Sequence, residues 1–140
     1  MTANPGDDLL DATGAGPQDR VLIVGGSGAD LLCASVRRGC RSAVGMARPS
    51  THPEPADVVL APDVRTAEDA SSVAASARRA LIAGRQGGRL ALRLLAGGAP
   101  LVGEVVRRLQ QQGFAGIRAT MSSGRGLVLT CRLGRRPVVG

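Results

Sequence analysis

The residues whose types and spacing most suggest chemistry are those of the glycine-rich turn Gly25-Gly26-Ser27-Gly28. The turn follows the apolar, β-branched run Val21–Val24, which is typical of a buried strand, and precedes a stretch with a helical pattern, Ala29–Arg38. Glycines between a strand and a helix let a ligand approach backbone N–H groups closely. We therefore expect a ligand site here, although many α/β proteins use such a turn only to pack the strand against the helix.

Two kinds of site that use a glycine turn between a strand and a helix can be compared with this sequence, a dinucleotide site and a nucleophile elbow. A dinucleotide fingerprint would place a glycine where Leu31 stands, but Arg48 follows the second expected strand, where an NADP 2′-phosphate is bound in such folds. An NADP-binding domain therefore stays as an outside option. Ser27 also lies in a sequence that approaches a nucleophile elbow, but the only histidine, His52, lies in a proline-rich stretch, so a nucleophilic role is not favoured.

Strands and helices must alternate to position this turn. The spacing of apolar residues, caps and glycines predicts three helices, with Thr66 as the N-cap of the second and Gly84 at its end. The last two strands are joined by Ser122–Arg125 and read as a hairpin. We expect an α/β fold with a mostly parallel sheet and a C-terminal antiparallel hairpin. The expected strands are 21–24, 42–46, 58–61, 89–95, 117–121 and 126–133, and the expected helices are 29–38, 66–84 and 100–112.

Length and charge divide the chain into a tail and one domain. The 140 residues are 44% hydrophobic, which is enough to fill one core. Residues 1–19 contain four Asp and no base, and they lack periodicity, so we expect a flexible acidic tail. Residues 20–140, the expected domain, contain 18 Arg and seven acids, a net charge of +11. All bases are Arg, and one Phe is the only aromatic residue, so base stacking is not available and nucleic-acid binding is not favoured, although the arginines leave it open.

The sequence also bears on compartment and metals. No apolar run approaches the roughly 20 residues of a spanning helix, and the first residues lack the basic head and apolar run of a signal peptide, so we expect no membrane association. The three cysteines, Cys33, Cys40 and Cys131, form no CxxC pair, and we expect them to be reduced, buried and packed as small hydrophobes in a cytoplasmic protein. With one histidine and no cysteine near it, no zinc site is expected.

The order of the motifs from residue 20 to residue 134 resembles that of the class I S-adenosylmethionine-dependent methyltransferases. Residues 21–29 look like the first motif of that family, a strand and a glycine loop under the cofactor, and residues 57–64 look like its fourth-strand segment. Residues 78–92 are similar to the helix and glycine pair that lead into the fifth strand, and residues 113–130 resemble the closing hairpin. The resemblance implies a Rossmann-like, methyltransferase-type fold with S-adenosylmethionine as the cofactor.

The resemblance also assigns roles to residues of this chain. It implies that the glycine turn lies under the methionine part of the cofactor and that the segment from Asp57 to Asp63 borders the cofactor and the reaction centre. Asp63 is then the candidate base or orienting group, although an exposed acid before a helix is the more ordinary role. The cofactor-binding residues so implied are Gly25, Gly26, Ser27, Gly28, Met46, Ala47, Asp57 and Ala61.

Two departures from the family pattern keep a second function open. The family usually has an acid at the end of the second strand to bind the ribose hydroxyls, whereas this chain has Met46, followed by Ala47 and Arg48. Only about ten residues separate that strand from Asp57, too few for a helical crossover, which needs a dozen or more. The chain is therefore expected to be either a small methyltransferase or a non-catalytic relative that acts as a structural or regulatory partner of another protein or of a second copy.

Overall fold

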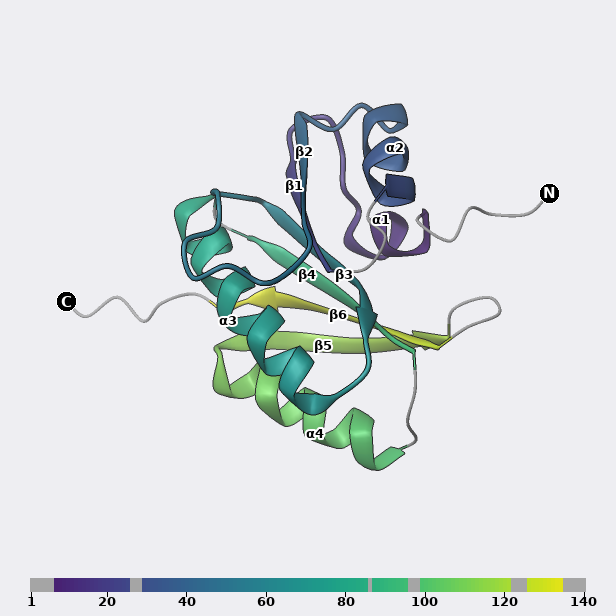
Figure 1. Cartoon of the computed structure of the whole chain (residues 1–140), viewed down its shortest axis with the longest axis vertical. Helices are drawn as coiled ribbons and strands as arrows, with labels where there is room; N and C mark the ends of the chain where they lie inside the picture. Colours follow the sequence, from purple (N-terminus) through teal and green to yellow (C-terminus); the bar gives the residue numbers. More distant parts are fainter. Residues whose placement is uncertain (1–6, 26–28, 86, 96–98, 122–125, 135–140) are drawn as a thin grey trace.

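The computed structural model describes residues 7–25, 29–85, 87–95, 99–121 and 126–134 (Figure 1). Its centre is a six-stranded sheet with the order β2-β1-β3-β4-β6-β5. The first four strands in this order are parallel, and β6 lies antiparallel between β4 and β5. The strands are β1 (Arg20–Val24), β2 (Ser42–Met46), β3 (Val58–Val64), β4 (Arg89–Leu94), β5 (Phe114–Met121) and β6 (Leu127–Leu133). The expected sheet, mostly parallel with an antiparallel hairpin at the end, is confirmed.

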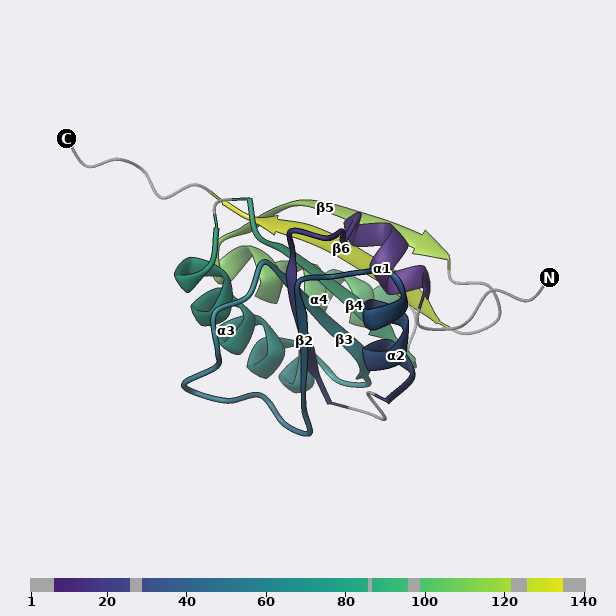
Figure 2. The same ribbon diagram turned by 90° about the horizontal axis from the view of Figure 1, so that it is seen from above.

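Helices cover both faces of the sheet (Figure 2). Helices α1 (Asp7–Thr13) and α2 (Ala29–Arg37) lie on one face, which we call the α1 face. Helices α3 (Ala67–Ala83) and α4 (Ala99–Gln111) pack against each other on the opposite face, the α3 face. No helix in the described part of the chain is long and apolar enough to cross a membrane.

The expected elements match the observed ones closely. The Oγ1 atom of Thr66 accepts a hydrogen bond of 3.0 Å from the backbone N–H of Asp69, as expected for the N-cap of α3. Strand β3 runs three residues further than expected, to Val64, because a bulge between Ala61 and Val64 accommodates Pro62, which has no N–H for the ladder. The expected turn at residues 122–125 lies outside the described residues.

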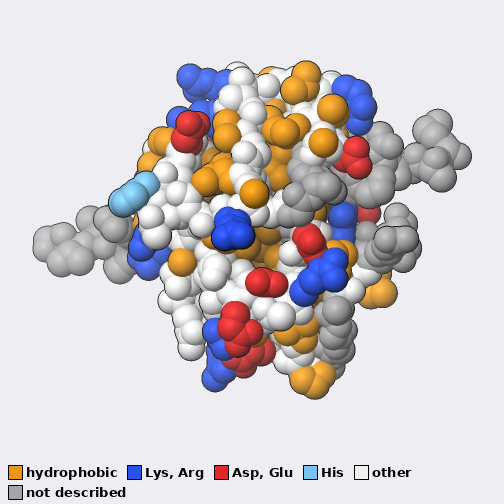
Figure 3. Space-filling view, viewed as in Figure 1, with side chains coloured by type: hydrophobic (Ala, Val, Ile, Leu, Met, Phe, Trp, Pro, Cys, Tyr) orange, Lys and Arg blue, Asp and Glu red, His pale blue; other side chains and the backbone are white. Residues whose placement is uncertain are grey.

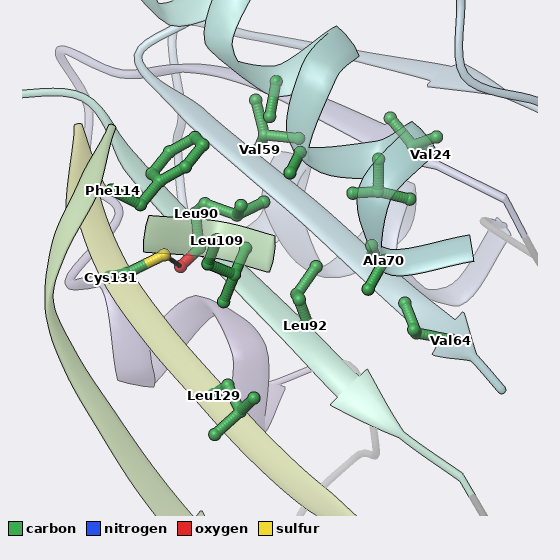
Figure 4. Close-up of a cluster of buried hydrophobic side chains, with 14 of the residues drawn as sticks. Val24, Val59, Val64, Ala70, Leu90, Leu92, Leu109, Phe114, Leu129 and Cys131 are labelled. Carbon is green, nitrogen blue, oxygen red and sulfur yellow. Dashed lines mark hydrogen bonds between the residues drawn. The ribbon is translucent and has the colours of Figure 1, made fainter. Parts of the chain in front are cut away.

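The main core lies on the α3 face, between the sheet and the helices α3 and α4 (Figure 4). The expected alternation in β6 is confirmed, because Leu129 and Cys131 point into this core beside Leu109 and Phe114. The Sγ atom of Cys131 lies 3.8 Å from the carbonyl oxygen of Leu90, and burial raises the pKa of this thiol to about 12, so Cys131 serves packing. The expectation that all the cysteines are buried is wrong for Cys33, which is exposed.

The expectation of a flexible tail is wrong for residues 7–19, which fold onto the sheet as part of the domain. Leu9 and Leu10 of α1 are fully buried in the core of the α1 face. The Arg38 guanidinium donates from Nε to the Ala15 carbonyl at 2.7 Å, which ties the segment to the end of α2. A pair of leucines among four aspartates carries no clear periodicity, so the sequence hides this helix. Residues 1–6 lie outside the described residues.

A buried carboxylate, that of Asp57, joins three segments at the amino edge of the sheet. It accepts hydrogen bonds from the backbone N–H groups of Arg20 at 2.8 Å and of Arg85 at 3.0 Å, and from Nε of Arg20 at 3.3 Å. Burial opposes its ionisation, but these donors outweigh burial and hold the pKa of Asp57 far below its usual range. The carboxylate therefore fixes β1 and the turn after α3 against the start of β3.

The burial of α1 generates a stability prediction. Replacing Leu10 by Ala removes a fully buried side chain and leaves a cavity, so the free energy of unfolding should fall by about 2–5 kcal/mol in urea titrations. Val36→Ala, at a position that is 71% exposed, is the control and should change it by less than about 0.5 kcal/mol. Equal stabilities of the two variants would show that α1 does not belong to the cooperative core.

The Asp57 network predicts a pH dependence. Because its pKa is lowered on folding, Asp57 contributes stability above about pH 4, its unfolded pKa, and loses that contribution as the pH falls toward the folded pKa. Asp57→Asn should be less stable than the native protein at pH 7, and denaturant titrations should show the gap narrowing between about pH 4 and pH 2. The exposed Glu54→Gln is the charge-matched control. A gap that stays constant over this range would contradict the assignment.

Candidate functional site

The glycine turn lies against the end of the neighbouring strand. Gly25 has a φ of +80°, a region that other residues enter only with strain, and its N–H donates a 2.7 Å hydrogen bond to the carbonyl oxygen of Met46. This bond holds the start of the turn beside the end of β2. The remaining predicted turn residues, Gly26, Ser27 and Gly28, lie outside the described residues.

The strand order makes this edge of the sheet a switch point. From β1 the chain passes through α2 on one face to β2, and β3 then pairs with the opposite side of β1 and leads into α3 on the other face. In open α/β sheets, ligands bind beyond the carboxyl ends of the strands whose connections leave toward opposite faces, and here those strands are β1 and β3. Of the predicted residues, Gly25 directly follows β1, Asp63 is the next-to-last residue of β3 and Met46 is the last residue of β2, so the structure brings these three to one edge.

Asp63 is the ionisable group that β3 supplies at this edge. Its side chain is 34% exposed, and its Oδ1 accepts a 2.9 Å hydrogen bond from Nε of Arg65. Sequence reasoning missed Arg65, although an acid followed two residues later by a base at a strand end was a signal for this pair. The charge-assisted hydrogen bond holds this carboxylate in place at the end of β3, where a carboxylate could orient an acceptor or take a proton.

The end of β2 carries no carboxylate. Met46 is partly buried against the core of the α3 face, and the following residues, Ala47 and Arg48, are exposed. A thioether is only a weak hydrogen-bond acceptor, so Met46 offers an apolar contact and no strong partner for hydroxyl groups.

Two of the predicted cofactor residues do not reach this edge. Asp57 precedes β3 and so lies at the opposite, amino edge of the sheet, where its carboxylate is engaged by Arg20 and Arg85. Ala61 is buried in the core of the α3 face, with 1% of its surface exposed. The sequence placed both beside the site because they belong to the segment that ends there. A strand of seven residues, however, separates its two ends by about 20 Å.

A loop, residues 47–57, replaces a helical crossover between β2 and β3. It crosses the α3 face of the sheet, where Nη1 of Arg79 donates to the Thr51 carbonyl at 3.0 Å and the Ala56 N–H donates to the Ala80 carbonyl at 3.0 Å. Figure 3 shows hydrophobic side chains gathered at the surface over β1 and β2, and Val44 is only partly buried there. The short connection leaves β2 as an edge strand of the sheet.

No protein-family model matches this sequence, and the search of curated proteins found no similar sequence. Solved structures do match. The chain superposes on an S-adenosylmethionine-dependent O-methyltransferase from Thermotoga maritima with a TM-score of 0.71 and 16% identity, covering 98% of this chain and 68% of that one. A second match is an S-adenosylmethionine-dependent methyltransferase from Aquifex aeolicus, with a TM-score of 0.68, 14% identity and coverage of 91% and 89%.

A third similar structure contains a product of methyl transfer. It is the 1,6-didemethyltoxoflavin-N1-methyltransferase from Burkholderia thailandensis with bound S-adenosylhomocysteine, which matches with a TM-score of 0.65 at 14% identity and covers 94% of this chain and 77% of that one. The TM-scores show that the folds are alike, and at these low sequence identities the likeness concerns the fold alone. The chain therefore has the Rossmann-like fold of the S-adenosylmethionine-dependent methyltransferases.

Proposed function

We propose that this protein is a small S-adenosylmethionine-dependent methyltransferase whose cofactor site is the carboxyl edge formed by Gly25, Met46 and Asp63. The observation that carries the proposal is the position of Gly25. It turns the chain at a φ of +80° between β1 and α2, at the switch point of the sheet, and its N–H is bonded to the end of β2. Ligands in open α/β sheets bind at this place.

The residues present fit part of the cofactor. Gly25 has no side chain to cover the backbone at this edge, and Met46 supplies an apolar contact for a ring such as adenine. The cofactor supplies an electrophilic methyl group on a sulfonium. The chain's own contribution is to hold the acceptor in line and to keep the carboxylate of Asp63, paired with Arg65, available to orient it or take its proton.

One set of observations favours a second function, a non-catalytic domain that serves as a structural or regulatory partner of another protein or of a second copy. Met46 stands where a carboxylate would accept bonds from ribose hydroxyls, and Asp63 already has an ion-pair partner in Arg65. The loop at residues 47–57 replaces the crossover, and β2 is an edge strand, which is a surface that pairs readily with another chain. Cofactor affinity separates the two functions.

The cofactor proposal predicts binding that depends on Gly25. In calorimetric titrations, S-adenosylhomocysteine should bind the native protein, and Gly25→Ala should weaken binding at least tenfold because Ala strains the turn. The matched control is Gly113→Ala, which has the same kind of strain at a φ of +89° but lies between α4 and β5. Parallel titration with NADP tests the outside option. If Gly25→Ala and Gly113→Ala bind S-adenosylhomocysteine with equal affinity, the glycine turn is not part of the cofactor site.

The position of Met46 predicts a gain of affinity. A carboxylate that accepts ribose hydroxyls contributes charge-assisted hydrogen bonds of about 1.5–3 kcal/mol each, so Met46→Asp should tighten S-adenosylhomocysteine binding by tenfold or more. Met46→Leu, which keeps the apolar contact, should bind like the native protein. If neither the native protein nor Met46→Asp binds the cofactor product, the methyltransferase proposal fails and the partner function remains.

A further inference from the structure

A groove lined by arginines lies on the α1 face of the sheet, on strands away from the candidate cofactor edge. It has a volume of about 370 Å³ and is bounded by the end of α1 and by the strands β4, β6 and β5. Three arginines line it, one from each strand: Arg89 from β4, Arg132 from β6 and Arg118 from β5. No acidic residue is among its described lining residues.

The register of the strands forces these charges together. Arg89 and Arg132 are direct partners in the antiparallel pair of β4 and β6, so their side chains leave the same face of the sheet. Arg118 is the partner of Thr130, which is two residues from Arg132 and therefore on that face as well. Like charges directly opposite each other destabilise a sheet unless counter-charges offset them.

Among the described residues, only one of these three arginines has an ion-pair partner. Nη2 of Arg89 donates to Oδ1 of Asp19 at 2.7 Å, and Nη1 donates to the Thr13 carbonyl at the end of α1, also at 2.7 Å. Arg118 and Arg132 are exposed, and neither has an ion-pair partner among the described residues. Arg89 is thus a fixed part of the wall, whereas two guanidinium groups are left to face the groove.

A neighbouring cavity extends the same positive surface. It has a volume of about 340 Å³, shares Arg89 and Arg132 with the groove and adds Arg85. Two acids line it, but Asp57 is occupied by Arg20 and Arg85, and Asp19 by Arg85 and Arg89. Both carboxylates are therefore paired with arginines of the protein, and the net charge of the residues that line the two cavities is positive.

We propose that this groove is a binding site for phosphate groups, held by Arg118 and Arg132. Planar guanidinium groups donate paired hydrogen bonds to phosphate oxygens, which suits them to this ligand better than other cations. The hydroxyl of Thr130 lies between the two arginines as a neutral donor. Next to it, the bulge in β5 leaves Gly116 without a partner in the β6 register, so backbone also faces the groove there. The site is independent of the cofactor edge.

The test compares substitutions that remove the same charge at different places. Arg118→Gln and Arg132→Gln alter the groove, and Arg37→Gln, at an exposed position in the last turn of α2, is the matched control. The probes are pyrophosphate, followed by calorimetry, and a single-stranded oligothymidylate, followed by fluorescence anisotropy over a range of salt concentrations. Thermal melts check that all three variants fold, as expected for exposed positions.

The native protein should bind at least one probe, and each groove substitution should weaken that binding about tenfold while Arg37→Gln leaves it within twofold. Weakened pyrophosphate binding identifies a small phosphorylated ligand. A loss confined to the oligonucleotide, with a salt dependence reduced by about one ion for each arginine removed, identifies a nucleic-acid backbone as the source of the phosphate. No binding of either probe, or equal effects of all three substitutions, would overturn the proposal.

Discussion

The arrangement of the sheet depends on one buried carboxylate. Asp57 accepts hydrogen bonds from the backbone N–H groups of Arg20, at the start of β1, and of Arg85, just after α3, and from the Arg20 side chain. Gly84 lies so close to this place that a Cβ there would lie 2.1 Å from the Ala56 carbonyl oxygen, so a side chain does not fit. The end of α3 and the starts of two parallel strands are thus locked at the amino edge, and their registers fix where those strands end at the other edge.

That alignment gives the two edges of the sheet different chemistry. At the carboxyl edge the chain offers bare backbone at Gly25, an apolar side chain at Met46 and one acid, Asp63, paired with an arginine. At the amino edge, buried acids are consumed by structural ion pairs, and arginines on neighbouring strands remain exposed. An open α/β sheet separates these edges by the length of its strands, so a ligand at one does not contact the other.

The short connection at residues 47–57 explains how the domain folds with fewer elements than a helical crossover would need. A loop joined to α3 by the Arg79–Thr51 and Ala56–Ala80 hydrogen bonds makes this connection instead. The helix α1 compensates on the other face, where Leu9 and Leu10 fill the core over β3 and β4. The domain thus closes its core with a helix that precedes the first strand.

The sequence by itself determined the elements that depend on local signals. The β1 strand at Arg20–Val24 and the helix between Thr66 and Gly84 were predicted within a residue, because β-branched runs, caps and glycines act over a few neighbours. The alternation of strands and helices likewise predicted the fold, and the glycine turn pointed to the carboxyl edge as the candidate ligand site.

Only the tertiary structure decided which residues share a place. Leu9 and Leu10 are helical and buried because they pack against strands more than 40 residues further along the sequence, so no local pattern predicts this state. Asp57 and Asp63 are close in sequence, yet an extended strand holds them at opposite edges of the sheet. The opposition of Arg89 and Arg132 depends on the register of two strands separated by α4 and β5, and such pairing is set by the whole fold.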